Sequence, residues 1–79
     1  MRAEHWQQAA LDLEGWAVQL SSYAIGGHYL AEVEVISSRV TIARATEASR
    51  DGAEKRAIEK AAARLLSTRR VDFGLTVGG

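Results

Sequence analysis

Two stretches in which every second residue is apolar, followed by a long alanine-rich stretch, limit what this chain can fold into more than any other feature. Apolar residues stand at alternate positions over residues 16–20 and again over residues 29–35. A period of two is that of a β-strand with one buried face. Gly26-Gly27 lies between the two stretches and can adopt the positive φ angles of a turn. The pattern predicts two strands joined by this turn.

A third strand is expected after Ser37-Ser38, and this turn sets its register. In a two-residue loop, Val35 would face Val40 and Val33 would face Ile42, so that four apolar side chains share one face of the sheet. A slip by one residue would set valine against threonine. Ser-Ser is a poor pair for a type I′ turn, so a longer loop is the alternative. Together the segments predict a three-stranded antiparallel meander.

Helical spacing begins after Ser49, which suits the N-cap position. Asp51 would then lie in the first turn, where the helix dipole favours a negative charge. The apolar arc of this predicted helix consists of Ala53, Ala57, Ile58, Ala61, Ala62, Leu65 and Leu66. Its small alanine side chains would let the helix lie close against the sheet. The predicted core comprises Trp16, Val18, Val33, Val35, Ile42, Ile58, Ala61 and Leu65.

The N-terminal segment, residues 3–13, is expected to form a short helix. Its apolar residues recur at helical spacing, and Gly15 follows as the glycine that often ends a helix. The residues that set this spacing are Trp6, Ala9, Ala10 and Leu13. Both tryptophans, Trp6 and Trp16, are expected to join the core rather than to stack on a base or a ligand.

The C-terminal tail, residues 71–79, alternates again and predicts an extra strand. Four apolar residues would share one face of this strand, namely Val71, Phe73, Leu75 and Val77. Four exposed apolar side chains in a row would promote aggregation, so we expect the strand to add to an open edge of the sheet. The addition would occur within one chain or, as we favour, between two chains in a homodimer.

The chain as a whole is expected to be one α+β domain spanning residues 1–79, with the order helix, three strands, long helix. It contains no cysteine, which fits a reducing compartment but also permits export. No apolar run approaches the roughly 20 residues of a transmembrane helix, and the N-terminus lacks the apolar stretch of a signal peptide. We therefore expect a cytoplasmic protein without membrane contact.

Charge is distributed unevenly although the formal net charge is zero. Residues 1–48 contain three basic and six acidic side chains, whereas residues 49–79 contain seven basic and four acidic ones. This split indicates an anionic partner for the basic part or, as we favour, complementary surfaces within one fold. Arg56, Lys60 and Arg64, spaced four apart, form a basic stripe on the predicted helix. The stripe would face an acidic surface of the protein, a polyanion, or only solvent.

No pattern in the chain indicates catalysis. His5 and His28 are the only histidines and lie on different elements, without a carboxylate at a ligand spacing. Glu32 and Glu34 alternate with apolar residues, so they are expected on the solvated face of the sheet. Gly26-Gly27 precedes a strand and not a helix, which excludes a phosphate-binding loop. We expect no enzyme, no cofactor and no metal ion.

Two segments carry a family resemblance. Gly26-Gly27-His28-Tyr29 leads into the strand at residues 31–35, and Ser49-Arg50-Asp51-Gly52-Ala53-Glu54 opens the alanine-rich helix. With the expected order of elements, residues 3–67 resemble the double-stranded-RNA-binding domain, whose second strand follows a G-P-x-H-like element and whose last helix opens with a pattern like S-K-K-x-A-K. The resemblance implies that Arg50 corresponds to a phosphate-binding lysine. Asp51 and Glu54 replace the family's other two lysines, which predicts that most duplex binding is lost.

Two hypotheses of function follow. The first is a small non-enzymatic interaction module that acts by protein–protein contact, as an adaptor or as a phage-type inhibitor of a bacterial complex. The second is a weak double-stranded RNA or other nucleic-acid binder. Its candidate contact residues are His28, Arg50, Lys55, Arg56, Lys60 and Arg64.

Overall fold

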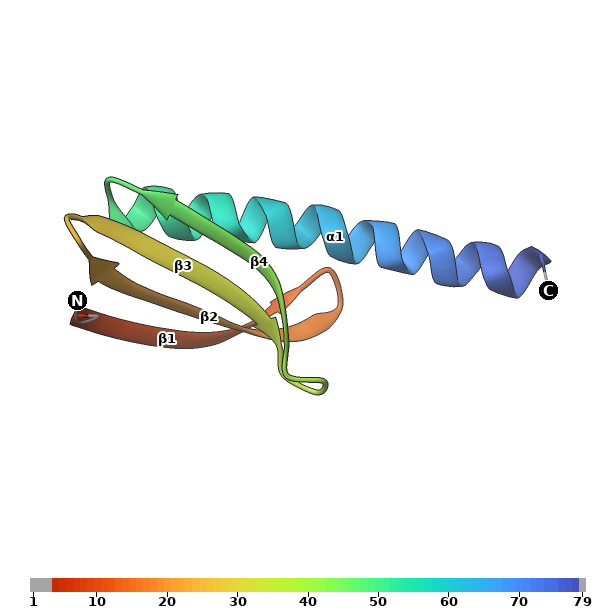
Figure 1. Cartoon of the computed structure of the whole chain (residues 1–79). Coiled ribbons are helices and arrows are strands. Elements are labelled where there is room, and N and C mark those ends of the chain that lie inside the picture. The colour runs from red at the N-terminus through yellow and green to blue at the C-terminus, as the bar shows by residue number, and fades with distance from the viewer. Residues whose placement is uncertain (1–3, 79) are drawn as a thin grey trace.

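Four antiparallel strands and one long helix make up the computed structural model, which describes the backbone of residues 4–78 and the side chains of residues 5–67. The elements are β1 (Glu4–Leu13), β2 (Trp16–Ile25), β3 (His28–Val35), β4 (Val40–Glu47) and α1 (Arg50–Gly78). The strands lie in the order β1-β2-β3-β4, and α1 packs on one face of this sheet (Figure 1). The α+β class is confirmed, but the sheet has four strands where three were predicted.

β1 replaces the predicted N-terminal helix. Residues 4–13 pair antiparallel with β2, and Leu13 lies opposite Trp16. Glu14 and Gly15 between them have φ angles of 53° and 83°, as a two-residue type I′ turn requires. Gly15 is therefore a hairpin glycine and does not end a helix. In so short a segment the apolar residues fit either period, and hydrogen bonding to β2 decides in favour of the strand.

The turn at Gly26-Gly27 is confirmed. Ile25 pairs with His28, and the two glycines have φ angles of 58° and 81°, again a type I′ turn. A Cβ atom built on Gly27 would meet no other atom within 4 Å. Strain from the left-handed backbone is therefore the main cost of any side chain at this position.

Gly27→Ala is expected to lower the free energy of unfolding by about 1 to 2 kcal/mol, because alanine must adopt the left-handed conformation. Gly27→Asn is the matched control, since asparagine tolerates this conformation better and should cost less. Urea unfolding of the three proteins measures both effects. Equal losses for alanine and asparagine would show that the backbone conformation is not what limits the turn.

The register between β3 and β4 is half confirmed. Val35 pairs with Val40, as predicted, but Val33 pairs with Ala43 because the register shifts between Val33 and Glu34. Ile42 is the extra residue on β4, so the predicted Val33–Ile42 pair is wrong. The connection is the longer alternative, with Arg39 at a φ of 60° and its N–H donating to the Val35 carbonyl at 2.8 Å. The shift turns Ala43 and Ala45 toward α1.

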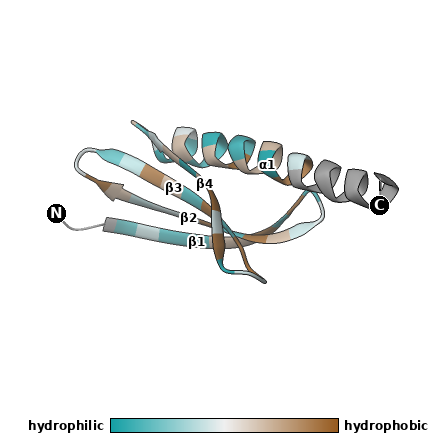
Figure 2. Cartoon of the chain, turned by 45° about the vertical axis from the view of Figure 1, so that its right-hand side comes forward, coloured by the Kyte–Doolittle hydropathy of each residue, from teal (hydrophilic) through white to brown (hydrophobic). Residues whose placement is uncertain are grey.

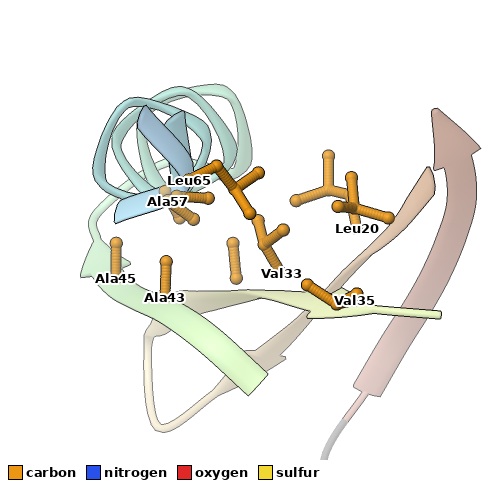
Figure 3. Close-up of a cluster of buried hydrophobic side chains, with 11 residues drawn as sticks. Leu20, Val33, Val35, Ala43, Ala45, Ala57 and Leu65 are labelled. Atoms are coloured by element: carbon orange, nitrogen blue, oxygen red, sulfur yellow. The ribbon is translucent and has the colours of Figure 1, made fainter. Parts of the chain in front are cut away.

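The core lies between α1 and the helix-side face of the sheet. Its buried members are Val18, Leu20, Ala31, Val33, Val35, Ala43, Ala45, Ala53, Ala57, Ala61 and Leu65. Five of the predicted core residues are among them, and Trp16, Ile42 and Ile58 are partly buried against them. Figure 3 shows Ala43 and Ala45 beneath Ala57, where small side chains meet. Apolar residues of α1 face the strands, and hydrophilic residues lie on its outer side (Figure 2).

α1 begins at the predicted cap and continues through the tail. The Ser49 hydroxyl accepts a hydrogen bond from the Gly52 N–H at 3.1 Å, which confirms the N-cap. The helix runs to Gly78 and projects beyond the sheet (Figure 1), so the predicted strand at residues 71–77 is wrong. The chain contains no proline to interrupt the helix. The side chains of the predicted oligomer contacts, Val71, Phe73, Leu75 and Val77, lie outside the described residues.

Candidate functional site

Arg50, the residue matched to a phosphate-binding lysine, is engaged inside the fold. Its Nη1 donates to the Ser22 hydroxyl at 2.7 Å, and its Nη2 donates to the His5 carbonyl at 2.6 Å. The guanidinium also lies 5.0 Å from the centre of the Tyr29 ring, within cation–π range. These contacts join the first turn of α1 to β1, β2 and β3. A second, phosphate-binding role would require the guanidinium to leave them.

Ser22 is the polar centre of this cluster and is completely buried. Its hydroxyl donates to Glu54 Oε2 at 2.6 Å while it accepts from Arg50. The bulge in β1 at His5, where φ is 55°, coincides with the carbonyl that Arg50 binds. Every buried side-chain polar atom among the described residues has a partner. We call Ser22, Arg50 and Glu54 the polar clasp, and its satisfied hydrogen bonds indicate a structural role.

The basic stripe lies along β4. α1 runs back beside this strand in the opposite direction (Figure 1), so successive turns of the helix meet successive parts of β4. Arg56 lies 3.7 Å from a Glu47 carboxylate oxygen, and the Lys60 ammonium donates to the Arg44 carbonyl at 3.1 Å. Arg64 follows one turn later, beside residues 41–44. Part of the stripe therefore faces the protein's own strand, as the self-complementary interpretation predicted.

A groove opens between β4 and α1. It has a volume of about 420 Å³ and is lined by Ile42, Ala43, Arg44, Lys60, Ala63 and Arg64. A shallower hollow of about 230 Å³ shares most of this lining and adds Thr41. β4 is the last strand of the sheet, so no further strand pairs with its outer edge, where Lys60 binds the Arg44 carbonyl. We call this feature the β4–α1 groove.

A large apolar side chain is exposed on the β4 side of the groove. Val40, the first residue of β4, is 52% exposed and directly precedes Thr41, which lines the shallower hollow. The groove thus combines unpaired backbone, positive charge and apolar surface. Such a combination suits an extended peptide, which brings backbone hydrogen-bonding groups and side chains together.

The open face of the sheet, opposite α1, carries a second set of side chains. Trp6 stacks on Tyr23 with ring centres 4.9 Å apart and planes inclined by 14°. Trp6 is 54% exposed, so its predicted place in the core is wrong. The bulge in β1 leaves Trp6 beside Tyr23 rather than against α1. Glu32 lies on this face as predicted and bonds Arg44 at 2.7 Å.

The candidate nucleic-acid contacts do not gather on one surface. Arg50 belongs to the polar clasp, and Arg56 and Lys60 contact β4. Lys55 and Arg64 are nine residues apart, or two and a half helical turns, which places them on opposite sides of α1. The imidazole Nδ1 of His28 lies 3.2 Å from the Gly26 carbonyl in the β2–β3 turn.

Comparison with known proteins assigns no site to this chain. Neither family models, nor curated proteins, nor solved structures gave a significant match to this chain. The resemblance to the double-stranded-RNA-binding domain therefore stays a hypothesis. Across residues 5–67, no three histidine or carboxylate side chains converge as metal ligands would. No described helix combines the length and the apolar character needed to cross a membrane.

Sequence reasoning found the basic stripe but not the groove beside it. The i, i+4 spacing of Arg56, Lys60 and Arg64 is visible in the chain, whereas the strand that they flank depends on how α1 packs. Ser22 was also missed, because a serine at an inward position of a strand resembles an ordinary surface serine of the other face. Its position in the alternation with Val18 and Leu20 was the available signal.

Proposed function

We propose that this chain is a small non-enzymatic interaction module that binds a partner protein through the β4–α1 groove. The observation that carries the proposal is the unpaired edge of β4, which borders a groove with basic and apolar residues. An edge strand can accept a further strand from another protein, and the adjacent side chains then give specificity. An adaptor and a phage-type inhibitor of a bacterial complex would both act in this way.

The dispersal of the basic side chains favours a protein partner over nucleic acid. Binding to a duplex requires several cations that face phosphates together. Here Arg50, Arg56 and Lys60 each contact the fold, and Lys55 lies on the opposite side of α1 from Arg64. An extended peptide needs only the edge of β4 and the two cations that line the groove, Lys60 and Arg64.

A site-specific photocrosslinker tests this proposal in cells of the native host. Placed at Thr41, which is exposed beside the groove, it should capture a protein, and nuclease treatment should leave that product unchanged. The same crosslinker at Lys55, on the far side of α1, is the control and should not capture this protein. A product that disappears with nuclease, or equal capture at both positions, would contradict a protein-binding groove.

Duplex RNA is expected to bind no tighter than about micromolar at physiological salt, as non-specific phosphate contacts do. Fluorescence anisotropy with a labelled RNA duplex, at several salt concentrations, measures this. Phosphate binding weakens steeply as salt rises, whereas a packed protein interface changes little. Nanomolar binding with a steep salt dependence would reverse the order of the two hypotheses.

A further inference from the structure

We propose that the β4–α1 groove binds an extended acidic segment as a fifth strand along β4, with acidic residues at alternate positions directed toward Lys60 and Arg64. The inference deepens the proposed function and rests on it, because it names the chemistry of the partner segment. It is carried by the spacing of the basic stripe, by the direction of α1 along β4, and by the distribution of charge along the groove.

The spacing of the stripe matches that of a strand. Residues four apart on a helix are separated by about 6 Å along its axis. Side chains on one face of a strand recur every two residues, or about 6.6 to 6.8 Å. Since α1 runs alongside β4, cations on successive turns recur along the edge at nearly the same interval. Acidic residues at positions i and i+2 of an added strand would therefore meet Lys60 and Arg64 in turn.

Two of the three cations of the basic stripe are available to bind acidic side chains of a partner. Arg56 is already paired with Glu47, the last residue of β4. This pair neutralises the positive charge at that end of the groove. The Lys60 ammonium uses one of its three donors on the Arg44 carbonyl, so two remain. Arg64 forms no hydrogen bond or ion pair with the described residues, and its guanidinium can bind a carboxylate through two donors. Of the three stripe cations, Lys60 and Arg64 are therefore the two that no carboxylate of the described residues pairs with.

The backbone of β4 favours a peptide over a simple polyanion. An unpaired edge presents both N–H donors and C=O acceptors, and an added strand satisfies both kinds. Phosphate groups are acceptors only and would leave the carbonyls without a donor. Val40 beside the groove, and Ile42 and Ala63 in its lining, add apolar surface that a peptide side chain can cover.

Three capped heptapeptides test the inference on the full chain by ¹H–¹⁵N NMR titration. TEVEVET has glutamates at alternate positions, TVEEEVT has the same composition with adjacent glutamates, and TKVKVKT reverses the charge. We expect TEVEVET to shift the amide signals of β4 and to bind more tightly than TVEEEVT, with TKVKVKT not binding. Shifts confined to other elements, or equal affinity for the first two peptides, would overturn the inference.

Charge reversal on the protein supplies the matched control. Arg64→Glu should weaken TEVEVET binding by about five- to tenfold, since it replaces an attractive pair by a repulsive one. The same variant should gain binding of TKVKVKT. Lys55→Glu makes the same change in net charge on the opposite side of α1 and should alter the dissociation constant by less than about twofold. Equal weakening by both variants would show that only the net charge of the protein matters, and it would contradict a site at Arg64.

Three further outcomes would also overturn the inference. If no peptide binds and Arg64→Glu instead self-associates in light scattering, the stripe serves only to protect the edge of β4, and the inference fails. If duplex RNA shifts the β4 amides at lower concentration than TEVEVET, the groove is a polyanion site, and the inference fails as well. A protein captured from Thr41 in host cells, with no binding of TEVEVET, would leave the proposed function standing and reject only the acidic strand.

Discussion

Leu65→Ala is expected to lower the free energy of unfolding by about 2 to 5 kcal/mol, the range for truncating a buried leucine. The Leu65 side chain is 3% exposed and packs among Val33 and the alanines that hold α1 on the sheet (Figure 3). Domains of this size have a small free energy of unfolding, and the expected loss is comparable to all of it. The variant should be largely unfolded at moderate temperature.

Leu66→Ala is the matched control for this change. Leu66 is the next residue of the same helix and is 44% exposed, so the substitution removes the same atoms from a position that water reaches much more than it reaches Leu65. Alanine favours the helix slightly, and the melting temperature should change little. Circular dichroism melts of both variants make the comparison. Similar losses for the two would contradict the conclusion that burial of Leu65 against the sheet sets the cost of its truncation.

Breaking the polar clasp is expected to have the second largest effect. Ser22→Ala removes the hydroxyl that Arg50 and Glu54 share, and leaves both charged groups short of a buried partner. An unsatisfied buried group costs about 1 to 3 kcal/mol, and more when it is charged. We therefore expect a loss of about 1 to 3 kcal/mol by urea unfolding, although only one oxygen atom is removed.

Arg50→Met distinguishes the contribution of the hydrogen bonds of Arg50 from that of the packing of its side chain. Methionine keeps much of the apolar stem of arginine but donates nothing to the His5 carbonyl or to Ser22. Amide exchange near the N-terminal end of β1 should quicken in this variant, because that carbonyl loses its contact with α1. The double variant with Ser22→Ala should lose less than the sum of the single losses. Additive losses with unchanged exchange would show that the clasp does not hold β1.

Local features of the chain were predictable because they depend on neighbours in sequence. The alternation in β2 and β3, the glycine turn between them and the serine cap of α1 all involve residues at most a few positions apart. Five of the eight predicted core residues are buried for the same reason, since a face of a strand or a helix follows directly from its period. The α+β class follows from these elements together.

Other features of the fold were decided by pairing between distant segments. β1 carries apolar residues that fit a helix as well as a strand, and only hydrogen bonds to β2 choose between them. A shift of one residue at the β3–β4 bulge brings Ala43, and not Ile42, opposite Val33, and no sequence pattern marks that residue as the extra one. The tail shows the same ambiguity, because residues 71–77 alternate like a strand and continue α1.

The candidate site likewise combines features that the sequence predicts with features that depend on tertiary packing. The sequence by itself determined that Arg56, Lys60 and Arg64 lie on one side of a helix, because a period of 3.6 residues places positions four apart together. Only the tertiary structure decided that this side borders the unpaired edge of β4, and that Arg50 turns inward to Ser22 and His5. Charge attraction and hydrogen bonding depend on distances in space, and these distances arise when α1 packs against the sheet.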